Sequence, residues 1–144
     1  MIVLKKFKIF FILLTILLVL FFVSCSDQKD IKKQQNITTG MMLYRNNCAN
    51  CHGKDGEGLN KAYPPLAGTD YILKNKNFLP CIIKNGLNGK INISNTTYDM
   101  PMPPVSLTDI EIAQIITYIS NEWGNNTEIT NRDEVIESLK NCKN

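Results

Sequence analysis

The stretch Cys48-Ala49-Asn50-Cys51-His52 decides the fold that we expect for this chain of 144 residues. Two cysteines separated by two residues and followed directly by histidine are the attachment pattern of a c-type haem. About one turn of helix between the cysteines lets both thiols reach the two vinyl groups on one edge of a porphyrin. The imidazole of the next residue can then coordinate the iron. We therefore expect one covalently bound haem c, held by Cys48, Cys51 and His52.

Other kinds of site also use two cysteines at this spacing. A thioredoxin-type redox pair needs a βαβ pattern around it, and the sequence shows none. A zinc site needs a second Cys/His pair at ligand spacing, but His52 is the only histidine and no second C-x-x-C occurs. A chance match is the remaining alternative. Haem attachment explains the motif best.

The first 24 residues have the organisation of an export signal. Lys5, Lys6 and Lys8 form a positive start, and the run from Ile9 to Val23 is apolar except for one threonine. Cys25 follows at the break, as in bacterial lipoprotein signals, which this segment resembles. In those signals the cysteine is lipidated and becomes the mature N-terminus. The alternative is an uncleaved membrane anchor, for which the apolar run is short.

Both interpretations tether the remaining chain outside the cytoplasm, and we favour the lipid on Cys25 because this cysteine has no other evident role. We expect a location on the periplasmic side of a bacterial membrane. The domains expected are a signal peptide at 1–24, a flexible tether at 25–37, the main domain at 38–125 and a C-terminal helical extension at 126–144. The tether is inferred from its polar composition.

Two of the five cysteines remain once lipid and haem have been assigned. In an oxidising compartment such a leftover pair readily forms a disulfide, so we predict the bond Cys81–Cys142. The alternative is two free, buried cysteines that act as small apolar residues.

The charge of the chain gives no support for nucleic-acid binding. Its formal net charge is +3, but three of its 16 basic residues and none of its 13 acidic residues lie in the first 24 positions. The chain from Cys25 onwards therefore has 13 residues of each sign and no basic patch. Its 120 residues suit one domain with a modest core.

The apolar pattern predicts an all-α fold of three to five short helices packed around the haem, with an added C-terminal helix. A first helix is expected from Thr38 or Thr39 into the haem motif, and a second region starts near Thr69. The strongest signal is the capping box at 108–111, followed by isoleucines at helical spacing. The added helix is expected to begin near Thr130. The alternation of Ile91 and Ile93 is too short to predict a sheet.

The iron needs a second axial ligand or an open site. Because His52 is the only histidine, two histidine ligands from one chain are excluded. Methionine is the expected partner, and Met100 and Met102 lie in the proline-rich segment 99–104. The prolines restrict this segment and would hold a weak thioether ligand in place. Both methionines remain candidates on this evidence.

These features together resemble the class I cytochromes c over residues 39–124. Gly40 and Tyr44 are similar to the glycine and aromatic residue at which the family's first and last helices cross, with Ile115 and Tyr118 as their partners. Pro64, with Pro65 as the alternative, resembles the proline whose carbonyl accepts a hydrogen bond from the haem-ligating histidine. The segment Pro101-Met102-Pro103 resembles the family's methionine segment. The resemblance therefore favours Met102 over Met100 as the iron ligand.

The resemblance implies electron transfer rather than catalysis. The expected protein is a monomer that carries electrons between redox proteins, a respiratory donor and a terminal reductase or oxidase. The alternative is a haem-bearing subunit through which electrons enter a larger oxidoreductase complex. A haem peroxidase or nitrite reductase is less favoured, because it needs an open iron and nearby acid or base groups, and His52 is already used.

Overall fold

The computed structural model describes residues 2–23 and 27–142 of the chain, without the side chains of residues 2–4 and 20–27. Cys25, which is predicted to carry lipid, lies outside the described residues. The chain divides into two compact units, Met1–Gln34 and Gln35–Asn144. The site that the sequence predicts lies entirely in the second unit.

The first unit contains the helix α1 (Ile2–Val23), and the helix α2 (Asp27–Asn47) begins in it. Helix α2 starts well before Thr38, so residues 27–37 are helical where the sequence analysis expected a flexible tether. This stretch has no glycine or proline and is rich in lysine and glutamine, which are good helix formers. In the part of the chain that the structure describes, no helix is long and apolar enough to cross a membrane.

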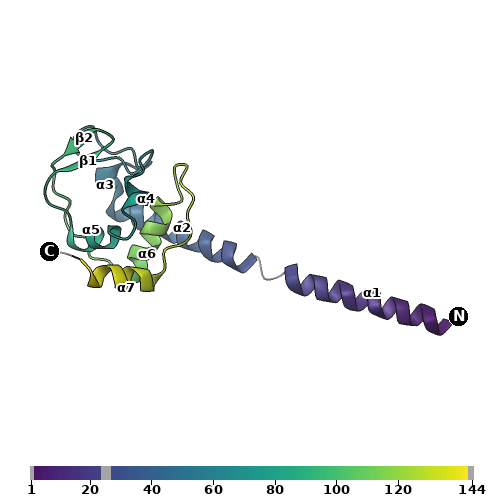
Figure 1. Ribbon diagram of the computed structural model, residues 1–144. Helices are drawn as coiled ribbons and strands as arrows, with labels where there is room; N and C mark the ends of the chain where they lie inside the picture. Colours follow the sequence, from purple (N-terminus) through teal and green to yellow (C-terminus); the bar gives the residue numbers. More distant parts are fainter. Residues whose placement is uncertain (1, 24–26, 143–144) are drawn as a thin grey trace. The chain divides into compact units, whose positions relative to one another are not determined.

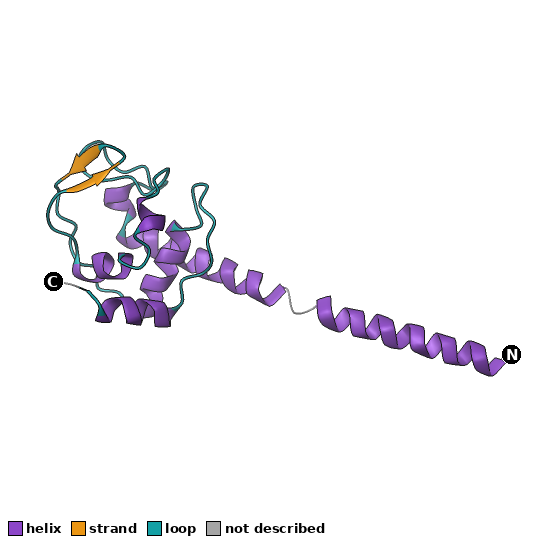
Figure 2. Cartoon of the chain, viewed as in Figure 1, coloured by secondary structure: helices purple, strands orange, loops and turns teal. Residues whose placement is uncertain are grey.

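The regular structure of the second unit is mainly helical, as the sequence predicts, and long loops connect the helices (Figures 1 and 2). After α2 come α3 (Ala49–His52), α4 (Tyr71–Lys74) and α5 (Leu79–Asn85), then α6 (Asp109–Ile119) and α7 (Arg132–Lys140). The second helical region of the sequence analysis is thus divided into α4 and α5. Pro80 stands in the first turn of α5, where a missing N–H costs nothing.

A β-hairpin of β1 (Ile91–Ile93) and β2 (Thr96–Tyr98) also belongs to the second unit, although the sequence analysis predicted no sheet. Ile91 lies opposite Tyr98, and Ile93 lies opposite Thr96. The turn residues Ser94 and Asn95 have φ values of 51° and 63°, as the tight turn of a two-residue hairpin requires. The prediction failed because strands of three residues leave almost no periodic pattern.

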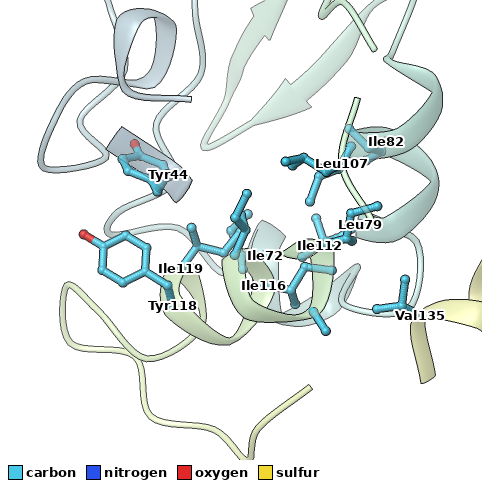
Figure 3. Close-up of a cluster of buried hydrophobic side chains, with 13 residues drawn as sticks. Tyr44, Ile72, Leu79, Ile82, Leu107, Ile112, Ile116, Tyr118, Ile119 and Val135 are labelled. Atoms are coloured by element: carbon cyan, nitrogen blue, oxygen red, sulfur yellow. The ribbon is translucent and has the colours of Figure 1, made fainter. Parts of the chain in front are cut away.

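Helix α6 lies at the centre of the hydrophobic core (Figure 3). The predicted capping box is present, with the Thr108 side chain accepting from the Glu111 N–H and the Glu111 carboxylate accepting from the Thr108 N–H. Gly40 of α2 lies against α6 so closely that a Cβ there would overlap the carbonyl oxygen of Gln114 and lie 2.7 Å from the Cβ of Tyr118. Glycine is therefore required where these two helices cross.

Three aromatic rings fill the space beside this crossing. The ring centroids of Tyr44 and Tyr118 are 5.4 Å apart, and each lies 5.6 Å from that of Trp123. Tyr44 also donates a hydrogen bond of 2.7 Å from its hydroxyl to the carbonyl of Gly53. The cluster therefore connects the crossing of α2 and α6 to the residue that follows the haem motif.

The added C-terminal helix is α7, and its N-cap is Asn131. Val135 of α7 is completely buried in the core (Figure 3). The predicted disulfide between Cys81 of α5 and Cys142 is present, with the two Cα atoms 5.7 Å apart. The C-terminal extension is therefore attached both by packing and by a covalent bond.

Candidate haem-binding site

Every residue that the sequence analysis named as a haem ligand lines one cavity in the second unit. The cavity has a volume of about 130 Å³. Its walls are mainly apolar, as expected for a site that surrounds a porphyrin. Cys48, Cys51, His52, Met100 and Met102 all contribute to its lining.

The two cysteines are placed by the short helix α3. Cys48 is its N-cap, and the Cys48 carbonyl accepts hydrogen bonds from the N–H groups of Cys51 (3.1 Å) and His52 (3.0 Å). Both thiols are free and half-buried. Burial, and to a lesser degree the neighbouring Cys51, raises the pKa of the Cys48 thiol to about 11. Without haem, this thiol is therefore protonated at neutral pH.

His52 is oriented by a hydrogen bond to the loop opposite. Its Nδ1 lies 3.0 Å from the carbonyl oxygen of Pro64, the proline that the resemblance favoured over Pro65. Since a carbonyl oxygen only accepts, Nδ1 must carry the proton and donate it. Burial lowers the pKa of His52, and the bond to Pro64 opposes this effect. The imidazole is therefore favoured in the neutral form whose Nε2 has a lone pair for a metal.

Backbone hydrogen bonds hold the Pro64 loop against the motif. The N–H of Gly58 donates to the His52 carbonyl at 2.8 Å, and the Gly56 carbonyl accepts from Leu66 at 2.8 Å. Gly58 has a φ of 72°, and a Cβ there would lie 2.5 Å from the Tyr63 carbonyl. The sequence analysis did not find this role, because the contacts of Gly58 arise only when the loop folds back.

The two candidate methionines differ in burial. Met102 is partly buried and packs against the core, whereas Met100 is 54% exposed. Met102 also pairs with Leu87 through two backbone hydrogen bonds of 2.9 Å, one in each direction. Both methionines therefore reach the cavity, but of the two only Met102 has its backbone paired with Leu87.

The hairpin supplies cavity residues that the sequence analysis missed, namely Ile91, Ile93 and Tyr98. Leu79 and Ile82 of α5 line the cavity as well. A weak signal for the hairpin exists in retrospect, because Ile91 and Ile93 alternate before Ser94-Asn95 and Tyr98 stands two residues after Thr96. These side chains make the cavity wall apolar and so suit it to a large planar cofactor.

The donor chemistry of the cavity fits a haem. Two thiols can form thioether links, while an imidazole and a thioether can complete the ligands of an iron that already has four porphyrin nitrogens. The apolar wall from α5 and the hairpin would exclude water from the ring. We conclude that the residues present match a covalently attached haem. They supply candidates for both thioether links and for both iron ligands.

Comparison with known proteins supports this conclusion. Residues 37–123 match the family model described as cytochrome c. The cytochrome c subunit of alcohol dehydrogenase (quinone) from Gluconobacter oxydans (strain 621H) is 30% identical over 103 residues, which cover 70% of this chain and 22% of that protein. Cytochrome c-552 of Thermus thermophilus is 34% identical over 82 residues, which cover 54% of this chain and 63% of that protein.

A third relative is the cytochrome c subunit of gluconate 2-dehydrogenase from Pantoea cypripedii. It is 25% identical over 115 residues, which cover 78% of this chain and 26% of that protein. The chain therefore spans about a quarter of the length of the two dehydrogenase subunits and less than two thirds of the length of cytochrome c-552.

Proposed function

Since the chain belongs to the cytochrome c family, its domain transfers electrons with covalently bound haem c, and we propose that it is a class I carrier with a single haem whose iron is ligated by His52 and Met102. The observation that supports this assignment is the single cavity lined by both motif cysteines, by His52 and by Met102. Met102 is favoured over Met100 because its backbone is paired with Leu87 and its side chain is the less exposed of the two.

Each residue would contribute a different property to the site. Cys48 and Cys51 would attach the haem, which supplies the one-electron chemistry when bound. The bond from His52 to Pro64 fixes the imidazole ring and raises its basicity. The Met102 thioether is a soft ligand that favours reduced iron and raises the reduction potential. Because His52 and Met102 would both hold the iron, the site would suit electron transfer rather than the binding of a substrate.

Carbon monoxide binding, combined with a redox titration, tests this ligand set. We expect the reduced, haem-loaded protein to bind carbon monoxide weakly, since the gas must displace Met102. We also expect a single one-electron transition in the titration. Rapid and tight binding of carbon monoxide by the native protein would contradict the proposal, because it would indicate an open axial position.

We further propose that the protein is a monomer tethered by lipid on Cys25 to the periplasmic side of a bacterial membrane. Support comes from the sequence pattern of residues 1–25 alone. Mass spectrometry of the mature N-terminus should find a lipidated Cys25, and Cys25→Ala should prevent this modification. A mature protein that still begins at Met1 would favour the uncleaved anchor instead.

A second candidate function is supported by the relatives that are subunits of dehydrogenases. In this case the chain would be the haem-bearing subunit through which electrons enter or leave a larger complex. Native electrophoresis of a mild detergent extract separates the two possibilities. The carrier should migrate alone at the mass of one chain, whereas the subunit should migrate with a partner of oxidoreductase activity.

A further inference from the structure

Helix α5 lies between the haem cavity and the C-terminal helix. Leu79 and Ile82 of α5 line the cavity. Cys81 does not; it lines a separate hollow together with Asp133 and Glu137 of α7. The disulfide to Cys142 therefore attaches α5 on a side that does not face the haem.

The end of α5 holds the backbone of the Met102 segment. The Ile83 carbonyl accepts a hydrogen bond of 2.9 Å from Val105, and Leu87 forms its two bonds of 2.9 Å with Met102. The ammonium group of Lys84 donates to the Leu107 carbonyl at 2.6 Å. Four hydrogen bonds thus connect residues 83–87 to residues 102–107, so the position of α5 sets the position of Met102.

Helix α5 is held in place mainly by packing, since five of its seven residues are buried. It has seven residues and no side-chain N-cap hydrogen bond, and helices this short are unstable alone. Helix α7 is anchored in the core by the completely buried Val135. The N–H of Thr130, just before α7, donates to the Thr117 hydroxyl of α6 at 3.0 Å. The disulfide therefore adds a covalent link between α5 and α7 to the packing that holds each of them.

We propose that the disulfide Cys81–Cys142 is a positioning element for the Met102 ligand. The bond fixes α5, and α5 fixes the backbone on which Met102 is held against the iron. The inference rests on the proposed function, since it requires Met102 as the ligand. In this proposal the C-terminal extension helps to position the iron ligand, in addition to stabilising the fold.

The test compares haem-loaded wild type with Cys142→Ala by the binding of imidazole to the oxidised iron. Imidazole must displace the methionine, so its affinity reports how firmly Met102 is held. We expect about tenfold tighter imidazole binding in Cys142→Ala, which corresponds to about 1.4 kcal/mol. The methionine-to-iron absorption band should weaken in parallel. The double variant Cys81→Ala/Cys142→Ala should behave in the same way, which excludes an effect of the free Cys81 thiol.

Thr108→Ala is the matched control, because it removes the cap of α6 and leaves α7 and the disulfide in place. We expect it to lower the stability of the fold while changing imidazole affinity less than about twofold, a difference of about 0.4 kcal/mol. Unchanged imidazole affinity in Cys142→Ala would overturn the inference. So would a Thr108→Ala variant with the same effect as Cys142→Ala at an equal loss of stability.

A second measurement covers the case in which Cys142→Ala does not fold. Ascorbate reduces the haem of the wild type and leaves the disulfide, whereas a water-soluble phosphine also reduces the disulfide. The phosphine gives two electrons, takes up an oxygen atom from water as its oxide, and leaves two thiols. Carbon monoxide should bind about ten times faster after phosphine treatment, and an equal rate would overturn the inference.

The spectrum of the wild type distinguishes a wrong ligand assignment from a wrong positioning role. If it lacks the methionine-to-iron absorption band, the ligand assignment is wrong and the inference is wrong with it. If the band is present and neither variant nor phosphine affects Met102, only the positioning role is wrong.

Discussion

The two sides of the haem cavity are built from contacts of different range. On the attachment side, residues 44–67, the hydrogen bonds join groups close in sequence, such as His52 with Pro64 and Gly58 with His52. On the methionine side, residues 83–107, the bonds join the end of α5 and Leu87 to a segment 15 to 23 residues later, and the disulfide behind α5 spans 61 residues. The attachment side is thus a local property of the sequence, whereas the methionine side depends on the tertiary fold.

Removal of a thioether link should have the largest effect, because it acts on the attachment side directly. In Cys51→Ser, the serine hydroxyl cannot replace the thiol in the link to the porphyrin. We expect the loss of most covalently bound haem. Haem-stained denaturing gels and the visible spectrum of the purified protein measure this.

Asn50→Ala is the control for this variant. Asn50 lies between the two cysteines and is exposed, so its replacement should leave haem content close to wild type. If Cys51→Ser retained haem at the level of Asn50→Ala, the attachment site would have been assigned to the wrong residues.

The two methionines provide the next largest effect and test the other side of the cavity. Met102→Ala should lower the reduction potential by at least about 59 mV, which is a tenfold change in the equilibrium of a one-electron couple. The reduced variant should also bind carbon monoxide readily. Met100→Ala should change both properties little, because Met100 is exposed. Redox titration of both variants shows which methionine is the iron ligand. A larger loss of potential in Met100→Ala than in Met102→Ala would identify Met100 as the ligand.

The same difference in range explains what the sequence could predict. The motif at 48–52 and the capping box at Thr108 depend on residues near in sequence, whereas the contact of His52 with Pro64 was expected from the family resemblance. The disulfide was predicted because only two cysteines remained once the others had roles. The preference for Met102 needed a family resemblance, since no sequence pattern around Leu87 or Met102 predicts their backbone pairing.

The sequence did not predict two features of the fold, the β-hairpin and the early start of α2. The hairpin was missed because its strands have three residues each, and its stability comes from facing the cavity. The early start of α2 was missed because its polar composition, typical of a tether, is equally compatible with a helix. Composition alone does not separate these two states, since lysine and glutamine suit both.

Gly86→Ala should disturb the methionine side more moderately. Gly86 has a φ of 78°, and a Cβ there would lie 2.5 Å from the Met102 carbonyl oxygen and 2.9 Å from the Pro104 nitrogen. We expect a loss of about 1–3 kcal/mol in the free energy of unfolding. A lower reduction potential should accompany it, because the collision displaces the Met102 backbone. Denaturant unfolding and redox titration measure the two effects.

Gly68→Ala is the control for Gly86→Ala, because it separates the strain of a positive φ from the steric overlap of the added Cβ. Gly68 has a similar φ of 64°, but nothing lies within 4 Å of a Cβ placed there. Its replacement should reduce stability by about 1 kcal/mol through the backbone conformation alone and leave the potential unchanged. An equal shift of potential in both variants would mean that general destabilisation, and not the position of Met102, controls the iron.

The smallest effect is expected at the start of α6, which belongs to the core and not to the haem ligands. Thr108→Ala removes the hydroxyl that caps the helix and should reduce the free energy of unfolding by about 1 kcal/mol. The potential should stay at the wild-type value, because Thr108 and Glu111 do not line the haem cavity. A shift of potential as large as that of Gly86→Ala would show that the methionine side responds to any loosening of the fold.

The capping box also gives a dependence on pH with a definite sign. Hydrogen bonds from the Thr108 hydroxyl and N–H lower the pKa of the Glu111 carboxyl in the folded protein. The ionised carboxylate therefore stabilises the fold fully above the ordinary glutamate pKa of about 4.3, and this contribution disappears as the pH falls through the lowered folded value. The difference in stability between wild type and Glu111→Gln should be largest at neutral pH and vanish in acid. Denaturant unfolding at a series of pH values measures it, and a difference that grew in acid would require a different partner for Glu111.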